Sequence, residues 1–97
     1  MYAVVNHLHL SIPVDQIVDG VEREGISLLK TLPGFQGINL VKVANDRAIV
    51  ILYWDSAAHA DNGAKTFGPT WFAKNIASYL ASEQQRSVGE LVVRYPQ

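Results

Sequence analysis

Hydrophobic and polar residues alternate along residues 2–12, YAVVNHLHLSI, in the pattern of a β-strand with one buried face. Asn6 and Leu8 share one face of this strand, and His7 and His9 share the other. Because the leucine face is the one that helices would cover, Asn6 is expected in the interior. The two histidines are expected on the opposite side of the sheet.

Three stretches repeat apolar residues at steps of three and four, which predicts amphipathic helices. The predicted helices cover residues 15–32, 55–65 and 70–81. Pro33 and Gly34 end the first helix. Asp55 or Ser56 is the expected N-cap of the second, and Gly68–Pro69 is expected to interrupt the helix before the third piece begins.

Three more stretches read as strands, over residues 35–43, 47–54 and 87–95. Asn45 and Asp46 tolerate positive φ and predict a hairpin turn between the first two of these strands. The element order is therefore βαββαβ, which indicates a ferredoxin-like α+β domain with a four-stranded antiparallel sheet and both helices on one face. The strand at residues 47–54 is apolar on both sides, so the bare face of the sheet also needs a cover. A symmetric homodimer would supply it.

Length and composition narrow the classes of protein that fit this pattern. The 97 residues suffice for a single domain, residues 1–97, and 48% of them are hydrophobic, which favours self-association. A net charge of −1 without a basic run gives no reason to expect a nucleic-acid partner. No run is apolar enough for a membrane span, and no signal peptide is recognised. The chain has no cysteine, which fits a cytoplasmic location.

Four segments spread over the chain carry a family resemblance: LPGFQGINLV, ILYWDSAAH, GPTWFAKNIASYL and RSVGELVV. In these segments the sequence resembles the dimeric α/β-barrel family that includes the antibiotic-biosynthesis monooxygenases. The resemblance implies a homodimer whose two sheets form a barrel, with an apolar pocket between helices and sheet in each protomer. It implies a cofactor-independent monooxygenase of a small aromatic or quinone-like compound. The alternative is a non-catalytic dimeric binding or stress-response module of the same fold.

The haem-degrading branch of that family offers a specific comparison. Asn6 in NHLHL matches the pocket asparagine of that branch. The tryptophan and histidine that the branch also needs would fall at positions nine and nineteen after Trp54, where this chain has Gly63 and Ala73. Haem degradation is therefore not expected, and no cofactor is predicted.

The resemblance and the residue types together nominate a site. The predicted catalytic residues are Asn6 and His59, and the predicted substrate-binding residues are Trp54, Trp71, Tyr79 and Arg94. Asn6 would donate a hydrogen bond to a developing enolate oxygen, and His59 would act as the base. The structural alternatives are a buried asparagine bound by the fold itself, core aromatic residues, a surface histidine and a solvated arginine.

His7 and His9 form an H-x-H pair, which is a partial metal-binding pattern. A site of this kind needs at least a third ligand, and residues 59–63, HADNG, do not form an H-E-x-x-H motif. We therefore predict no metal site and expect the pair at the dimer interface or its rim.

Overall fold

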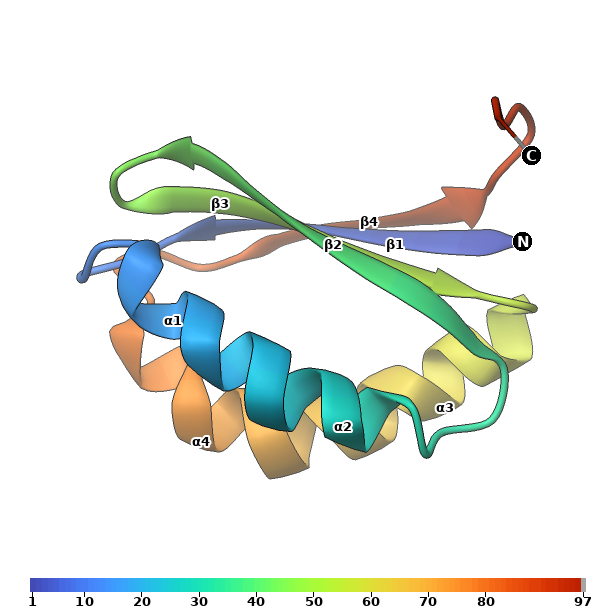
Figure 1. Cartoon of the computed structure of the whole chain (residues 1–97), viewed down its shortest axis with the longest axis horizontal. Coiled ribbons are helices and arrows are strands. Elements are labelled where there is room, and N and C mark those ends of the chain that lie inside the picture. Colours follow the sequence, from blue (N-terminus) through green and yellow to red (C-terminus); the bar gives the residue numbers. More distant parts are fainter. Residues whose placement is uncertain (97) are drawn as a thin grey trace.

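The computed structural model describes residues 1–96 and contains one antiparallel sheet with helices on one of its faces (Figure 1). The strands are β1 (Tyr2–His9), β2 (Phe35–Ala44), β3 (Arg47–Trp54) and β4 (Gln85–Glu90). Their order across the sheet is β2-β3-β1-β4. This arrangement confirms the predicted ferredoxin-like α+β fold.

The two helical segments both contain a wide π-helical turn. The first segment consists of α1 (Asp15–Gly20), a π-helical turn (Val21–Gly25) and α2 (Ile26–Leu29). The second consists of α3 (Ala57–Phe67), a π-helical turn (Gly68–Phe72), α4 (Ala73–Asn75) and a 3₁₀ turn (Ala77–Tyr79). Each segment lies beneath the sheet in Figure 1.

The predicted interruption at Gly68–Pro69 is wrong, because the chain stays helical there. A proline inside an α-helix removes one hydrogen bond and clashes with the carbonyl four residues earlier. The chain avoids the clash by widening the turn, in which the Ala73 N–H donates to the Gly68 carbonyl five residues before it. Ser56, one of the two predicted N-caps, caps α3 and accepts a hydrogen bond from the His59 N–H at 3.2 Å.

The hairpin after β2 is present, but it does not use positive φ. Among residues 1–96 only Gly34 has a positive φ, of 78°. A bulge between Lys42 and Ala44 supplies the extra twist before the turn at Asn45 and Asp46. The location of the turn was therefore predicted correctly, and its backbone type was not.

The last strand lies earlier in the sequence than its apolar residues suggest. β4 pairs with β1 alone, and β1 begins at Tyr2, the partner of Glu90. The Leu91 N–H donates to the Met1 carbonyl, and after this bond β1 offers no further residue with which the chain beyond β4 could pair. The residues after β4 therefore form an arm that leads away from the sheet (Figure 1).

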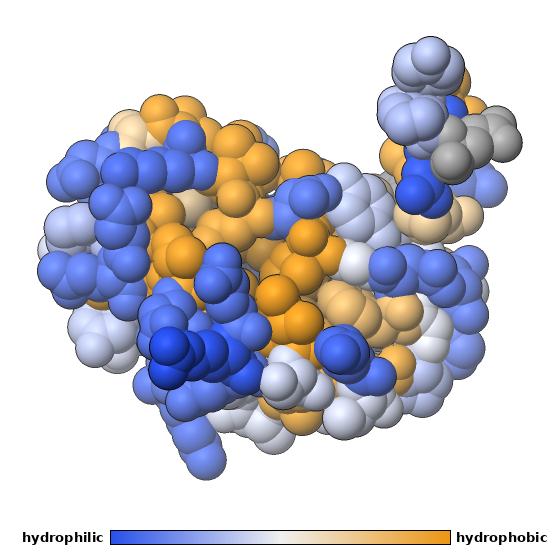
Figure 2. All heavy atoms as spheres, viewed as in Figure 1, coloured by the Kyte–Doolittle hydropathy of each residue, from blue (hydrophilic) through white to orange (hydrophobic). Residues whose placement is uncertain are grey.

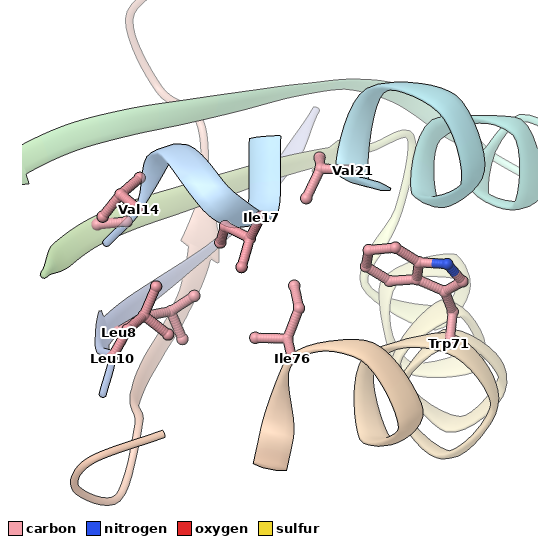
Figure 3. Close-up of a cluster of buried hydrophobic side chains, with 8 residues drawn as sticks. Leu8, Leu10, Val14, Ile17, Val21, Trp71 and Ile76 are labelled. Atoms are coloured by element: carbon pink, nitrogen blue, oxygen red, sulfur yellow. The ribbon is translucent and has the colours of Figure 1, made fainter. Parts of the chain in front are cut away.

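The core lies between the sheet and the helices. Figure 3 shows the apolar side chains of one buried cluster pointing toward one another from the β1 side, the first helical segment and the second helical segment. The labelled members are Leu8, Leu10, Val14, Ile17, Val21, Trp71 and Ile76. A second cluster packs beside it and consists of Val4, Leu29, Trp54 and Ala60. In the part of the chain that the structure describes, no helix is long and apolar enough to cross a membrane.

Candidate functional site

A cavity of about 260 Å³ lies between the helices and the sheet, beside the two core clusters. Its apolar walls come from β1, β2, β3 and both helical segments, and they include Val4, Leu29, Ile38, Leu52, Phe67 and Phe72. Asn6 also lines the cavity, whereas His7 is exposed on the other face of β1. The predicted orientation of this strand is therefore confirmed.

Two indoles form the aromatic wall of the cavity. Trp54 ends β3 and is 1% exposed, and the ring of Phe35 meets it edge-on with centroids 5.4 Å apart. Trp71 comes from the opposite side of the cavity and stacks on Phe67 at 5.5 Å. Its Nε1 donates a hydrogen bond to Glu24 Oε1 at 3.2 Å, which fixes the direction of the ring. The aromatic side chains thus serve both the core and the cavity.

Glycines allow these large rings to pack beside the cavity. A Cβ atom at Gly63 would overlap the Trp54 ring. A Cβ atom at Gly25 would lie 3.4 Å from Trp71, at the edge of ordinary contact. A tryptophan at position 63 would therefore not fit with Trp54 in its present position.

One end of the cavity is polar. The cross-strand partner of Asn6 is Arg86 on β4, and both line the cavity together with Gln84, which directly precedes β4. The Asn6 Oδ1 and Gln84 Oε1 atoms are buried and accept no hydrogen bond from residues 1–96. Buried polar atoms of this kind are usually bonded. Each of these two oxygens can therefore accept a hydrogen bond from a water molecule or from a ligand in the cavity.

The sequence pattern did not identify Gln84 and Arg86 as residues of the site. Residues two apart on a strand share a face, so Gln84 and Arg86 could have been paired from their spacing. A predicted strand that began earlier than residue 87 would have placed both side chains beside Asn6. The apolar run LVVRY drew the predicted strand to residues 87–95 instead.

His59 lies on α3 but is not among the residues that line the cavity. Its Nδ1 is 2.6 Å from Asp55 Oδ1, and both side chains are about half exposed. This hydrogen bond lowers the pKa of the Asp55 carboxyl below its usual value of 3.8. The interaction therefore stabilises the fold above about pH 4, and the contribution is lost as the pH falls through the lowered pKa.

Tyr79 and Arg94 also lie away from the cavity lining. Tyr79 is 41% exposed in the 3₁₀ turn, and Arg94 is exposed on the arm after β4. Of the six residues predicted for the site, the structure brings Asn6, Trp54 and Trp71 together at one cavity.

The second histidine of the H-x-H pair has protein partners of its own. His9 Nε2 is 3.1 Å from Asp46 Oδ2, in the turn after β2. Its Nδ1 is 3.5 Å from the Ser82 hydroxyl, at the limit of a hydrogen bond. Within residues 1–96, no three histidine or acidic side chains are grouped closely enough to hold a metal ion.

A second hollow, of about 270 Å³, lies between the first helical segment and β2. Figure 2 views the molecule from this side and shows apolar side chains gathered between the sheet and the helices, with polar groups around them. The ion pair between Lys42 and Asp15, at 3.2 Å, borders this hollow. It contains no polar group that is both buried and unpaired, in contrast to the first cavity.

These features define the class of protein as a ferredoxin-like α+β domain with a mostly apolar cavity between its helices and its sheet. A scan against protein-family models and a search of curated proteins returned no match. Solved structures do match over nearly the whole chain.

SnoaB, a cofactor-independent oxygenase from Streptomyces nogalater, is 13% identical with a TM-score of 0.79, and the match covers 99% of this chain and 97% of that one. A monooxygenase from the gene ActVA-Orf6 of Streptomyces coelicolor, in complex with nanaomycin D, is 11% identical with a TM-score of 0.73 over 96% and 92%. A variant of MhuD with two manganese protoporphyrin IX molecules per active site is 17% identical with a TM-score of 0.73 over 97% of each chain. The chain thus has the fold of the antibiotic-biosynthesis-monooxygenase-like proteins, and the resemblance seen in the sequence is confirmed at the level of the fold.

Proposed function

We propose that the protein is a cofactor-independent monooxygenase that acts on a small aromatic or quinone-like compound. The observation that carries the proposal is the cavity, in which two indoles and an aliphatic wall face an asparagine whose side-chain oxygen has no partner among residues 1–96. Aromatic walls favour a planar, apolar ligand, and the amide supplies the polar group that orients it. Two proteins of this fold, SnoaB and the ActVA-Orf6 product, are described as an oxygenase and a monooxygenase.

The proposed chemistry needs little from the protein. A phenolic substrate loses a proton, the resulting enolate passes one electron to O2, and the two radicals combine at a ring carbon. Loss of water from the peroxide leaves a new carbonyl, so one oxygen atom of O2 enters the product and the other leaves as water. Asn6 would donate a hydrogen bond to the enolate oxygen, and the apolar walls would keep bulk water from the radicals.

A direct test follows the oxygen atom. 1,4-Naphthohydroquinone and O2 should yield 2-hydroxy-1,4-naphthoquinone and water, and mass spectrometry after incubation under ¹⁸O2 should find one heavy oxygen atom in the product. Heat-denatured protein measures the spontaneous background. Addition of water to the quinone would incorporate ordinary oxygen instead. Incorporation no faster than with denatured protein would refute the proposed oxygenation of this substrate.

One observation favours the non-catalytic alternative, a binding module of the same fold. The residues that line the cavity include no histidine and no acidic side chain, so they offer no conventional base for the first proton. Tight binding of an aromatic ligand in the cavity without incorporation of heavy oxygen would select this alternative.

We also propose that the protein is a homodimer joined through the face of the sheet opposite the helices. That face includes Ile49 and Ile51, and Val41 is 44% exposed on it. The arm after β4 adds Val92, which is 84% exposed, and Tyr95, which is 95% exposed. A second copy would cover both apolar regions, and an obligate interface of this kind buries upwards of about 2,000 Å².

Replacement of Ile49 by aspartate should weaken the dimer by roughly 30-fold or more, because a charge would be buried near the centre of the proposed interface. Sedimentation equilibrium of wild type and I49D measures the effect. Ala58→Asp places the same charge on the exposed side of α3 and should leave association unchanged. A wild-type protein that stays a folded monomer at micromolar concentration would contradict the proposal.

A further inference from the structure

The polar end of the cavity has a specific chemical composition. Asn6 and Gln84 contribute amides whose oxygens are buried and unpaired, and Arg86 contributes a guanidinium. Within residues 1–96, Arg86 forms no ion pair. An arginine only donates hydrogen bonds, whereas an amide both donates and accepts them. The group that complements this set is an anionic oxygen, which pairs with the guanidinium, beside a hydroxyl, which donates to the amide oxygens.

Strand pairing fixes the position of these groups relative to one another. Asn6 and Arg86 are direct partners in the antiparallel ladder between β1 and β4. Side chains of such partners lie on the same face, with Cβ atoms about 4.5–5.5 Å apart. Gln84 is two residues before Arg86 and also lines the cavity. The side chains of Asn6, Gln84 and Arg86 can therefore bind neighbouring oxygen atoms on one edge of a single aromatic ring of the ligand.

The volume of the cavity limits the size of the ligand. About 260 Å³ is below the range of about 300–1,000 Å³ that is usual for sites of drug-sized molecules. One ring or two fused rings suit such a space.

We infer that the cavity selects a one- or two-ring aromatic compound with an ionised ring oxygen, which pairs with Arg86 while the amides of Asn6 and Gln84 bind the neighbouring ring oxygen. The inference rests on the proposed function for the aromatic nature of the ligand, and it names Arg86 and Gln84 as residues that determine specificity. An Arg–oxyanion contact is charge-assisted and stronger than a neutral hydrogen bond.

Arg86 also accounts for the loss of a proton from the substrate, although no base is found among the described residues that line the cavity. A cation beside a phenolic hydroxyl favours its ionised form. A substrate bound next to Arg86 would therefore give its proton to a water molecule near this exposed side chain. No protein base would be needed. The enolate required for electron transfer to O2 would be present in the bound state.

The test compares two probes of almost the same shape. 2-Hydroxy-1,4-naphthoquinone carries an acidic ring hydroxyl that is ionised at neutral pH, and 1,4-naphthoquinone lacks it. Quenching of tryptophan fluorescence, with Trp54 and Trp71 in the cavity wall, reports binding without turnover. Wild type should bind the hydroxyquinone at least about tenfold more tightly at pH 7. This preference should vanish when acid protonates the probe.

The variants assign the preference to residues. Arg86→Gln should abolish the preference at pH 7, and Arg86→Lys should keep part of it because the charge remains. Arg94→Gln removes the same charge from the arm and should keep all of it. Equal binding of both probes by wild type, or equal loss in R86Q and R94Q, would overturn the inference. A preference that depends on Arg86, in a protein that incorporates no heavy oxygen, would refute the monooxygenase proposal and support the inference.

Discussion

Replacement of Gly63 by alanine is expected to lower the free energy of unfolding by about 1–3 kcal/mol, the usual cost of forcing extra volume into a packed interior. The added methyl group would overlap the ring of Trp54. This ring cannot move aside easily, because it is 1% exposed and belongs to the second core cluster, together with Val4, Leu29 and Ala60. The penalty should exceed the gain of about 1 kcal/mol that alanine brings to a helix in place of glycine.

Gly68→Ala is the matched control for this prediction. Gly68 also lines the cavity and lies five residues further along the same helical segment, but a Cβ atom there would meet no other atom within 4 Å. This substitution should be close to neutral, because the higher helix propensity of alanine is offset by its Cβ, which disfavours a helical backbone directly before Pro69. Urea unfolding of wild type, G63A and G68A measures the two effects. A G63A protein as stable as G68A would show that Trp54 is free to shift.

The contact between Gly63 and Trp54 also gives a physical reason for the glycine at position 63. The sequence shows only that this position holds glycine. The structure shows that it faces the buried indole of Trp54, so a larger residue there would require Trp54 to move.

The sequence predicted well those elements in which the pattern of buried residues decides the structure. The alternation in β1 identified the faces of Asn6 and His7, because a strand with one buried face fixes its own orientation. The alternation of apolar and polar residues did not predict the limits of β4, in which only Val88 is a large apolar residue. The limits of β4 come from the length of β1, its neighbour in the sheet, and this is information about another part of the chain.

One part of the surroundings of His59 could not be predicted for a related reason. Helical spacing places Asp55 one turn before His59, where the two side chains can pair, but it does not show what packs against the pair. Asp55 binds His59 at the start of α3, and the backbone at Gly34, with a φ of 78°, runs close against both. That approach depends on a loop 25 residues earlier in the chain, so the periodicity of the helix does not contain it.

The Asn6 side chain should have opposite effects on stability and on activity. Asn6→Leu removes a buried amide oxygen that accepts no hydrogen bond within residues 1–96, so the free energy of unfolding should rise by about 1 kcal/mol or more. If the amide stabilises the enolate as proposed, the same variant should incorporate heavy oxygen about 100-fold more slowly or worse, the usual cost of one lost donor to a developing oxyanion.

The control for this last prediction lies one residue along the same strand. His7→Ala changes an exposed side chain on the face away from the cavity and should leave oxygen incorporation near the wild-type rate. Thermal midpoints and initial rates under ¹⁸O2 for N6L and H7A separate the two roles. A gain in stability with full activity in N6L would mean that Asn6 is a buried polar residue without a part in the chemistry. A loss of stability in N6L would mean that the amide has a partner in the folded protein, and that the cavity has no unpaired group there to offer a ligand.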